Sequence, residues 1–108
     1  MPVVPTRLYG PAQPATTNAT IYTVPAATYT ILKEIIVTNT TAAAALISVA
    51  INGTAATAAN CILEGKSVPA DNVEVYALST VLNAADTIQA LQGTASALTV
   101  TLSGTEFS

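Results

Sequence analysis

The stretch that decides the fold is residues 28–41, TYTILKEIIVTNTT. It is rich in β-branched residues and ends in Asn and Thr, a composition typical of a strand that runs into a turn. A strand with one solvated face alternates apolar and polar residues, but here apolar side chains occur on both parities. The two sets are Tyr29, Ile31, Ile35 and Val37, and then Leu32 and Ile36. Both faces of the strand are therefore expected to be partly dry.

Two explanations for the second dry face are open. In the first, a neighbouring subunit or an N-terminal arm covers Leu32 and Ile36. In the second, a β-bulge at Lys33-Glu34 shifts the parity and brings Leu32 and Ile35 to the same side, so that no second dry face exists. We predict the first, which makes Leu32 and Ile36 a partner-binding strand face. Unbroken strand pairing through residues 33 and 34 would exclude the bulge.

The remainder of residues 19–108 repeats this pattern of short strands and turns. Runs rich in Val, Ile and Thr are separated by turn residues, such as Pro25 and the Asn52-Gly53 pair. The expected strands are residues 19–24, 28–39, 44–52, 61–65, 72–80, 86–93 and 97–107. Short strands at this spacing, in a chain one domain long, predict an all-β fold, an antiparallel β-sandwich of Ig-like or jelly-roll topology.

The first 18 residues differ in composition from the rest. Residues 1–18 hold four of the six prolines and show no period of two or 3.6 residues, so they predict an extended, partly polyproline-like arm. Residues 19–108 are then a single β-sandwich domain. The alternative for the arm is a disordered tail, but a solvated tail has no need of apolar anchors. We predict that the arm binds a partner through Val3, Val4, Arg7, Leu8 and Tyr9.

Composition excludes several classes of partner. Charged residues make up 8% of the 108, against about 25% in ordinary soluble domains, and a surface so poor in charge predicts packing against copies of the chain or other proteins. The three basic residues, Arg7, Lys33 and Lys66, cannot neutralise a run of phosphates, so we expect no nucleic-acid partner. The apolar runs are shorter than the ~20 residues of a membrane span, and no secretory signal is visible. We expect no membrane partner and synthesis in the cytoplasm.

No catalytic arrangement is visible in the sequence. The chain has no His and a single Cys, which excludes Ser-His-Asp and Cys-His sites and zinc clusters. Its acids are expected to be solvated or to cap turns, and neither Asp71-Asn72 nor Asn83 with Asp86 has the dense spacing of a calcium loop. We therefore predict no catalytic residue, no metal, no cofactor and no enzymatic activity. The acids are Glu34, Glu64, Asp71, Glu74, Asp86 and Glu106.

Four motifs carry a resemblance that spans nearly the whole chain. They are the strand start at residues 21–26, the strand at 32–41, the turn at 82–88 and the SG-x-E end at 103–106. Together they resemble a group of small tailed-bacteriophage virion structural proteins, which are head-decoration or tail-associated proteins. The usual glycine of the third motif is Ala85 here, which argues against a positive-φ turn at that point.

The resemblance implies one of two functions. The first is a capsid decoration or cement protein, which binds the head surface and stabilises it through subunit contacts and the N-terminal arm. The alternative is a tail, collar or baseplate component, with a receptor- or glycan-binding role. Glycan binding uses exposed aromatic residues, and because aromatics are only 5% of this chain we favour the first. The resemblance also implies a homotrimer, the major capsid protein or other virion proteins as partners, and location in the virion after synthesis in the host cytoplasm.

Overall fold

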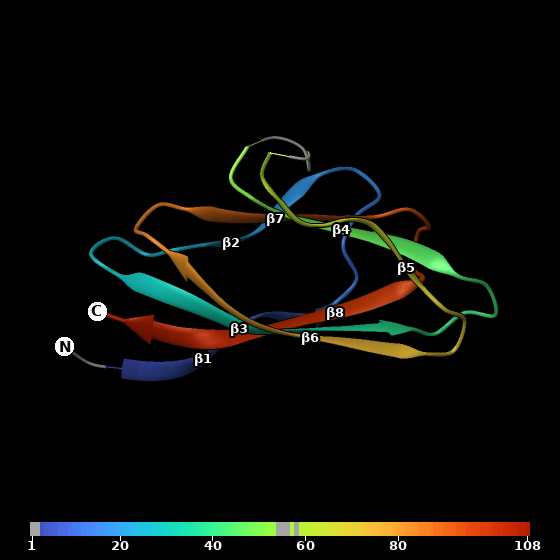
Figure 1. The fold of residues 1–108 in the computed structure, drawn as a ribbon, viewed down its shortest axis with the longest axis horizontal. Helices are drawn as coiled ribbons and strands as arrows, with labels where there is room; N and C mark the ends of the chain where they lie inside the picture. The colour runs from blue at the N-terminus through green and yellow to red at the C-terminus, as the bar shows by residue number, and fades with distance from the viewer. Residues whose placement is uncertain (1–2, 54–56, 58) are drawn as a thin grey trace.

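The chain folds into two facing layers of antiparallel strands, as seen in a computed structural model that describes residues 3–53, 57 and 59–108 (Figure 1). Eight strands and no helix are found among these residues, which confirms the all-β prediction. The strands are β1 (Val3–Ala12), β2 (Ala19–Thr23), β3 (Tyr29–Asn39), β4 (Ala45–Ile51), β5 (Cys61–Val68), β6 (Val73–Leu82), β7 (Thr87–Gln92) and β8 (Leu98–Phe107).

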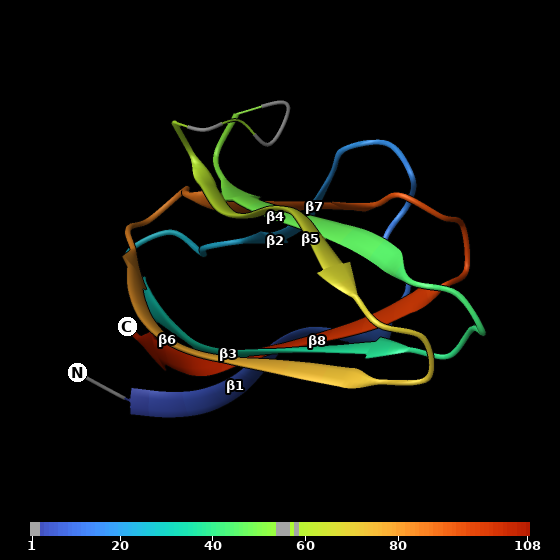
Figure 2. The ribbon, with the colours of Figure 1, turned by 45° about the vertical axis from the view of Figure 1, so that its right-hand side comes forward.

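The order of the strands decides between the two predicted topologies. One sheet has the order β1-β8-β3-β6 and the other has the order β2-β7-β4-β5, so the chain changes sheet at nearly every connection. Figure 2 shows the first sheet as the lower layer and the second as the upper one. Two four-stranded antiparallel sheets connected in this way form a jelly roll. The predicted β-sandwich is confirmed, and its topology is the jelly roll rather than the Ig-like arrangement.

Strand β3 contains the β-bulge that was one of the two explanations for its apolar pattern. Its pairing with both β6 and β8 shifts register between Leu32 and Glu34. The side chains of Leu32 and Ile35 consequently both point into the core, where each is 0% exposed. Ile36 points to the outside of the sheet and is half-buried. The predicted partner-binding face of Leu32 and Ile36 is therefore wrong for Leu32, because an extra residue in the strand restores a single dry face.

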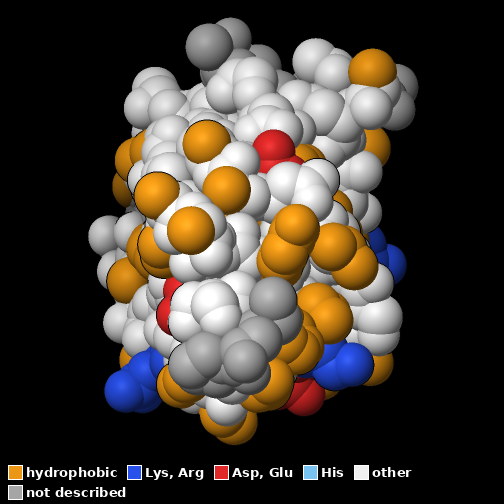
Figure 3. Space-filling model, turned by 90° about the vertical axis from the view of Figure 1, so that its left-hand side faces the viewer, with side chains coloured by type: hydrophobic (Ala, Val, Ile, Leu, Met, Phe, Trp, Pro, Cys, Tyr) orange, Lys and Arg blue, Asp and Glu red, His pale blue; other side chains and the backbone are white. Residues whose placement is uncertain are grey.

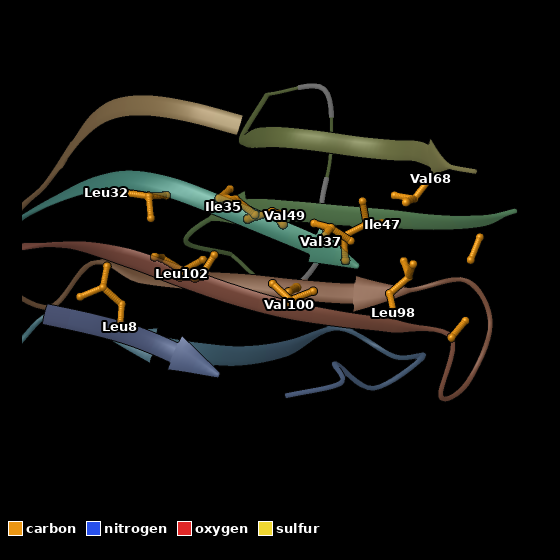
Figure 4. Close-up of a cluster of buried hydrophobic side chains, with 14 of the residues drawn as sticks. Leu8, Leu32, Ile35, Val37, Ile47, Val49, Val68, Leu98, Val100 and Leu102 are labelled. Carbon is orange, nitrogen blue, oxygen red and sulfur yellow. The ribbon is translucent and has the colours of Figure 1, made fainter. Parts of the chain in front are cut away.

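The core lies between the two sheets and is aliphatic. Figure 4 shows labelled side chains from both layers pointing toward one another in this space. Tyr9, Tyr22 and Tyr76 are only partly buried and pack around the edge of this cluster. The aromatic-poor composition is thus matched by a thin core of small branched side chains. Among its fully buried members are Leu32, Ile35, Val37, Ile47, Val49, Val68, Leu82, Ile88, Leu98, Val100 and Leu102.

The structure corrects the predicted N-terminal arm. Residues 3–12 form β1, which pairs antiparallel with β8 from Val3 opposite Phe107 to Ala12 opposite Val100. Leu8 on this strand is 8% exposed and belongs to the core. The prolines misled the prediction because a strand at the edge of a sheet needs only one of its two rows of hydrogen bonds and so tolerates proline. The sandwich therefore begins at β1, not at residue 19.

Gly104 on β8 explains why β1 and β3 can lie so close to this strand. It is the glycine of the SG-x-E motif and stands opposite Thr6 on β1 and Leu32 on β3. A Cβ atom at this position would clash with the backbone carbonyl of Ile31 and would touch the side chain of Leu8. Glycine at this position therefore allows β8 to pack closely between β1 and β3.

Two buried amide side chains hold the connections between strands. Gln92 is 1% exposed; its Nε2 donates to the carbonyl of Pro14, and its Oε1 accepts from the Leu98 amide at 2.8 Å. Asn39 is also 1% exposed, and its Nδ2 donates to the carbonyl of Val68 at 3.0 Å. Since an unpaired buried amide is costly, these bonds fix the β1–β2 connection and the end of β5 against the rest of the fold.

The turn between β6 and β7 corrects the prediction for Ala85. Its φ is 70°, so the positive-φ turn is kept without the glycine. The turn is held by the Asp86 carboxylate, whose Oδ2 accepts from the Asn83 amide at 2.8 Å. The Ala85 amide donates to the carbonyl of Val24 at 3.1 Å. These bonds impose the left-handed conformation on an alanine, which alone disfavours it.

Candidate functional site

The outer face of the β1-β8-β3-β6 sheet carries exposed apolar side chains in register. On β6 the odd-numbered residues point outward, and Val73, Val75 and Val81 are 49%, 55% and 61% exposed. Val75 stands opposite Ile36 on β3, and Val81 stands opposite Ile31. We call this surface the outer face, and its apolar members are Val3, Pro5, Tyr29, Ile31, Ile36, Val73, Val75, Ala77, Val81 and Phe107.

The charged side chains of the outer face lie close to a single row across the sheet. Arg7 on β1 is opposite Ser103 on β8, Ser103 is opposite Glu34 on β3, and Glu34 is opposite Ala77 on β6. Lys33 lies at the bulge beside this row, and its Nζ donates to the Ser79 hydroxyl at 3.4 Å. Apolar pairs lie on both sides of the row, so the outer face is apolar with one polar band.

The opposite face of the sandwich is different in character. On the outside of the β2-β7-β4-β5 sheet, Gln89 is 4% exposed, and its Nε2 donates to the hydroxyls of Thr20 and Thr87 at 2.8 Å each. Asn18 Nδ2 donates to the Gln89 Oε1 at 3.0 Å. The Ser48 hydroxyl accepts from the Gly65 amide at 2.9 Å. The polar side chains of this face are held by its own hydrogen bonds, and its one exposed large apolar side chain among the described residues is Leu46, at 48%. The outer face presents several exposed apolar groups, the feature that marks interaction surfaces.

Of the five residues predicted as partner-binding in the arm, three are exposed. Val3 and Val4, at 56% and 50% exposure, begin β1, and Arg7 is exposed in its middle. Leu8 is a core residue, and Tyr9 packs against the core with its pKa raised by burial. Leu8 is therefore not available to a partner, because it alternates with the outward-facing Arg7 and points into the core. A partner-binding role for Val3, Val4 and Arg7 stays a prediction.

Ile36 is the other predicted residue that lies on the outer face, and sequence reasoning missed the valines beside it. Strand β6 carries apolar residues on both parities, with Val75 and Val81 on one and Leu78 on the other. Since alternation does not say which set faces the core, the exposed set could not be chosen from the sequence. Figure 3 shows the end of the molecule that carries the chain termini, where exposed hydrophobic side chains alternate with scattered Lys, Arg, Asp and Glu side chains.

Two acidic side chains, Glu106 and Asp86, form hydrogen bonds that stabilise the fold. The Tyr22 hydroxyl on β2 donates to the Glu106 carboxylate on β8 at 2.5 Å and accepts from the Thr30 hydroxyl at 2.9 Å, which joins the two sheets. Burial and the hydrogen bond to Glu106 raise the pKa of Tyr22 to about 12. Asp86 accepts from the Asn52 Nδ2 at 3.1 Å in addition to capping its turn. Both carboxylates therefore have structural partners.

Other candidate sites are sparse in the described part of the chain. Within it, no group of three His, Cys, Asp or Glu side chains is placed to hold a metal ion. No helix among the described residues is long and apolar enough to cross a membrane. A shallow pocket of about 370 Å³ lies between the β2–β3 and β6–β7 turns. It is lined by Ala27, Thr28, Tyr29, Asn83 and Ala84. The prediction of no enzymatic activity stays a prediction.

The comparisons with known proteins concern the fold. No protein-family model matches the sequence, and no curated protein matches it. A chain of the T13 infectious bursal disease virus particle is similar with a TM-score of 0.59 and 9% identity, over 97% of this chain and 30% of that one. A chain in the structure of the Gx strain of the same virus gives a TM-score of 0.57 and 6% identity, over 97% and 31%. At these identities the likeness shows a shared fold, and this chain spans about a third of those chains.

Proposed function

We propose that this chain is a bacteriophage virion structural protein that decorates the head and binds it through the outer face. The observation that carries the proposal is the contrast between the two faces of the jelly roll. One carries the Gln89 hydrogen bonds and exposes a single large apolar side chain among the described residues, Leu46, while the other exposes Val73, Val75 and Val81, the last two opposite Ile36 and Ile31. An apolar sheet face of this kind gains free energy when a partner covers it.

Three further observations support a place in a virion. Jelly rolls are common in viral capsid proteins, and the similar structures come from a virus particle. Only 8% of the residues are charged, as suits a protein that is packed against neighbours. The sequence motifs resemble small tailed-phage structural proteins. The partner is then the major capsid protein or another virion protein, and Val3, Val4 and Arg7 contribute from the edge strand β1 rather than from a free arm.

A second candidate function is a tail, collar or baseplate component that binds a glycan. The observation that favours it is the shallow pocket of about 370 Å³ beside Tyr29, which is 51% exposed. An exposed aromatic ring beside an Asn side chain is a combination that sugars can stack on and hydrogen-bond to. Tyr29 is one aromatic residue, however, and the apolar outer face is the larger feature, so we favour decoration.

The proposal is tested by blocking the centre of the outer face. Thr101 lies on β8 opposite Ile36 and is half-buried and polar, so Thr101→Arg adds a bulky charge without removing a core side chain. We expect this variant to melt close to the wild type but to lose occupancy on particles that lack the wild-type copy. The matched control is Ser67→Arg, at an exposed position of β5 in the other sheet, which should bind normally. Full occupancy by the Thr101→Arg variant would contradict docking through the outer face.

A further inference from the structure

A jelly roll has four sheet edges, and in this chain three of them carry features that prevent pairing with another strand. Edge strands are commonly blunted by proline, charge, bulges or short length. Strand β1 contains Pro5 and Pro11, an exposed Arg7, and two shifts of register against β8. This edge is therefore poorly suited to pair with a strand of another chain.

The two edges of the other sheet are blunted in different ways. Strand β2 is five residues long, has a shift of register against β7, and is followed by Pro25. Strand β5 carries Glu64 and Lys66, both exposed, on either side of Gly65, whose φ is 59°. Its pairing with β4 is also interrupted by shifts of register. Neither strand presents a long regular edge.

Strand β6 has fewer of these features, and the one register shift in its pairing with β3 lies between Ala77 and Thr80. It ends the order β1-β8-β3-β6, is ten residues long, and contains no proline or glycine. Its residues alternate without interruption between exposed and half-buried. Glu74 is its one charged residue, near the end of the strand and on the inward side. A long edge that has no proline or glycine and carries mostly apolar side chains is a template for strand addition.

We propose that a second copy of this chain pairs antiparallel with β6 about a two-fold axis at Ala77. The strand is self-complementary in this register: Val73 stands opposite Val81 on the outside, and Tyr76 stands opposite Leu78 on the inside. Glu74 stands opposite Thr80, so no two like charges meet. The two sheets then form one continuous eight-stranded sheet, and the two outer faces lie on the same side of it.

The contact between the two β6 strands is small. Pairing two such strands with their flanking side chains buries on the order of 1,000 Å² in total, the lower end of specific interfaces. We therefore expect a dimer whose fraction rises with concentration in solution. Copies held side by side on a surface have a high effective concentration, which favours the same contact there. A two-fold contact gives a dimer in place of the homotrimer that the resemblance implies.

The test introduces charge at the two-fold axis. Ala77 is exposed, so Ala77→Lys and Ala77→Glu leave the core intact, but each places two like charges opposite one another in the dimer. Sedimentation equilibrium should give a dimer for the wild type and a dissociation constant raised at least about tenfold for each variant. An equimolar mixture of the two variants should restore association, because Lys then faces Glu. Ser67→Lys on the β5 edge is the control and should dimerise like the wild type.

Three outcomes would overturn the inference: a wild-type monomer at every concentration, a trimer, or a dimer that Ala77→Lys does not weaken. Failure to restore association in the mixture would show that Ala77 of one copy does not face Ala77 of the other, which overturns the proposed two-fold register. Occupancy of the Thr101→Arg variant on particles is measured separately, two strands away from this edge. A failed dimer with normal docking, or the reverse, therefore tells the two proposals apart.

Discussion

Ala85 shows how a single residue can stand in an unfavourable conformation because its neighbours fix it. Its φ of 70° is held by the bond from its own amide to the Val24 carbonyl and by the Asp86 cap on Asn83. For an L-residue with a Cβ this region costs roughly 1–2 kcal/mol, and glycine avoids the cost while losing more backbone entropy on folding. The turn therefore tolerates alanine, but glycine at position 85 would give a more stable fold.

We predict that Ala85→Gly stabilises the protein by about 0.5–1 kcal/mol, because the relief of strain exceeds the entropy lost. The matched control is Ala84→Gly. Ala84 is an exposed neighbour whose φ is not positive, so this variant should be neutral or destabilised. Chemical denaturation of both variants measures the difference. A destabilised Ala85→Gly variant would mean that this turn does not hold residue 85 in the left-handed region.

Tyr22 predicts a loss of stability at high pH. Its pKa is raised to about 12 by burial and by the bond to Glu106, whereas the unfolded chain has the ordinary value of 10.0. Its stabilising effect is fully present below pH 10. As the pH rises from 10 to 12 the unfolded state loses this proton while the folded state keeps it, so the free energy of unfolding falls.

The measurement is denaturant unfolding from pH 8 to pH 12 for the wild type and for Tyr22→Phe. The variant should lose less stability over the alkaline part of this range, because it has no hydroxyl to titrate at that position. Some alkaline loss should remain, since burial also raises the pKa values of Tyr9 and Tyr76. Parallel pH profiles for the two proteins would contradict the assignment to Tyr22.

At the level of elements, local pattern predicts strands but not their partners. Period-two alternation identified the strands after residue 19 because one face of each is dry. The jelly-roll order could not be predicted, since it depends on pairings such as β1 with β8, which are almost the whole chain apart. The bulge at Leu32–Glu34 was visible as a change of parity, but covering by a partner explains the same parity. The outer face could not be predicted, because β6 has apolar residues on both of its sides and the sequence does not show which side faces the core.

The bulge in β3 predicts how three neighbouring substitutions rank. Leu32→Ala and Ile35→Ala should each cost about 2–4 kcal/mol, because both side chains are 0% exposed in the core. Ile36→Ala should cost clearly less, since Ile36 is half-buried on the outer face. Equilibrium unfolding of the three variants gives the ranking. A Leu32→Ala variant as mild as Ile36→Ala would restore the interpretation of an unbroken strand with a partner-covered face.

Strand β1 predicts that removal of residues 2–12 is not tolerated. The deletion takes Leu8 out of the core and leaves β8 as a new unpaired edge, with a combined cost comparable to the total stability of a small domain. We expect the truncated chain to be unfolded or aggregated by circular dichroism and gel filtration. A cooperative melt at the wild-type temperature would show that residues 3–12 are an appendage after all.

The whole molecule is a sandwich with two unlike surfaces. The outside of one sheet carries a hydrogen-bond network centred on Gln89, while the other exposes Val75 and Val81 opposite Ile36 and Ile31 on β3. The few charges, Arg7 and Glu34 with Lys33 beside them, cross the outer face as a band that can orient a partner without dominating the contact. The fold serves here as a rigid support for one apolar face and one open edge.

The most direct test of the central claim is the number of copies of this chain in purified phage particles, measured by quantitative mass spectrometry against the major capsid protein. A head-decoration protein is present in numbers that follow capsid symmetry, on the order of hundreds of copies per particle. We predict that result. Tens of copies or fewer would move the protein to the tail or collar, and its absence from purified particles would contradict a structural role in the virion.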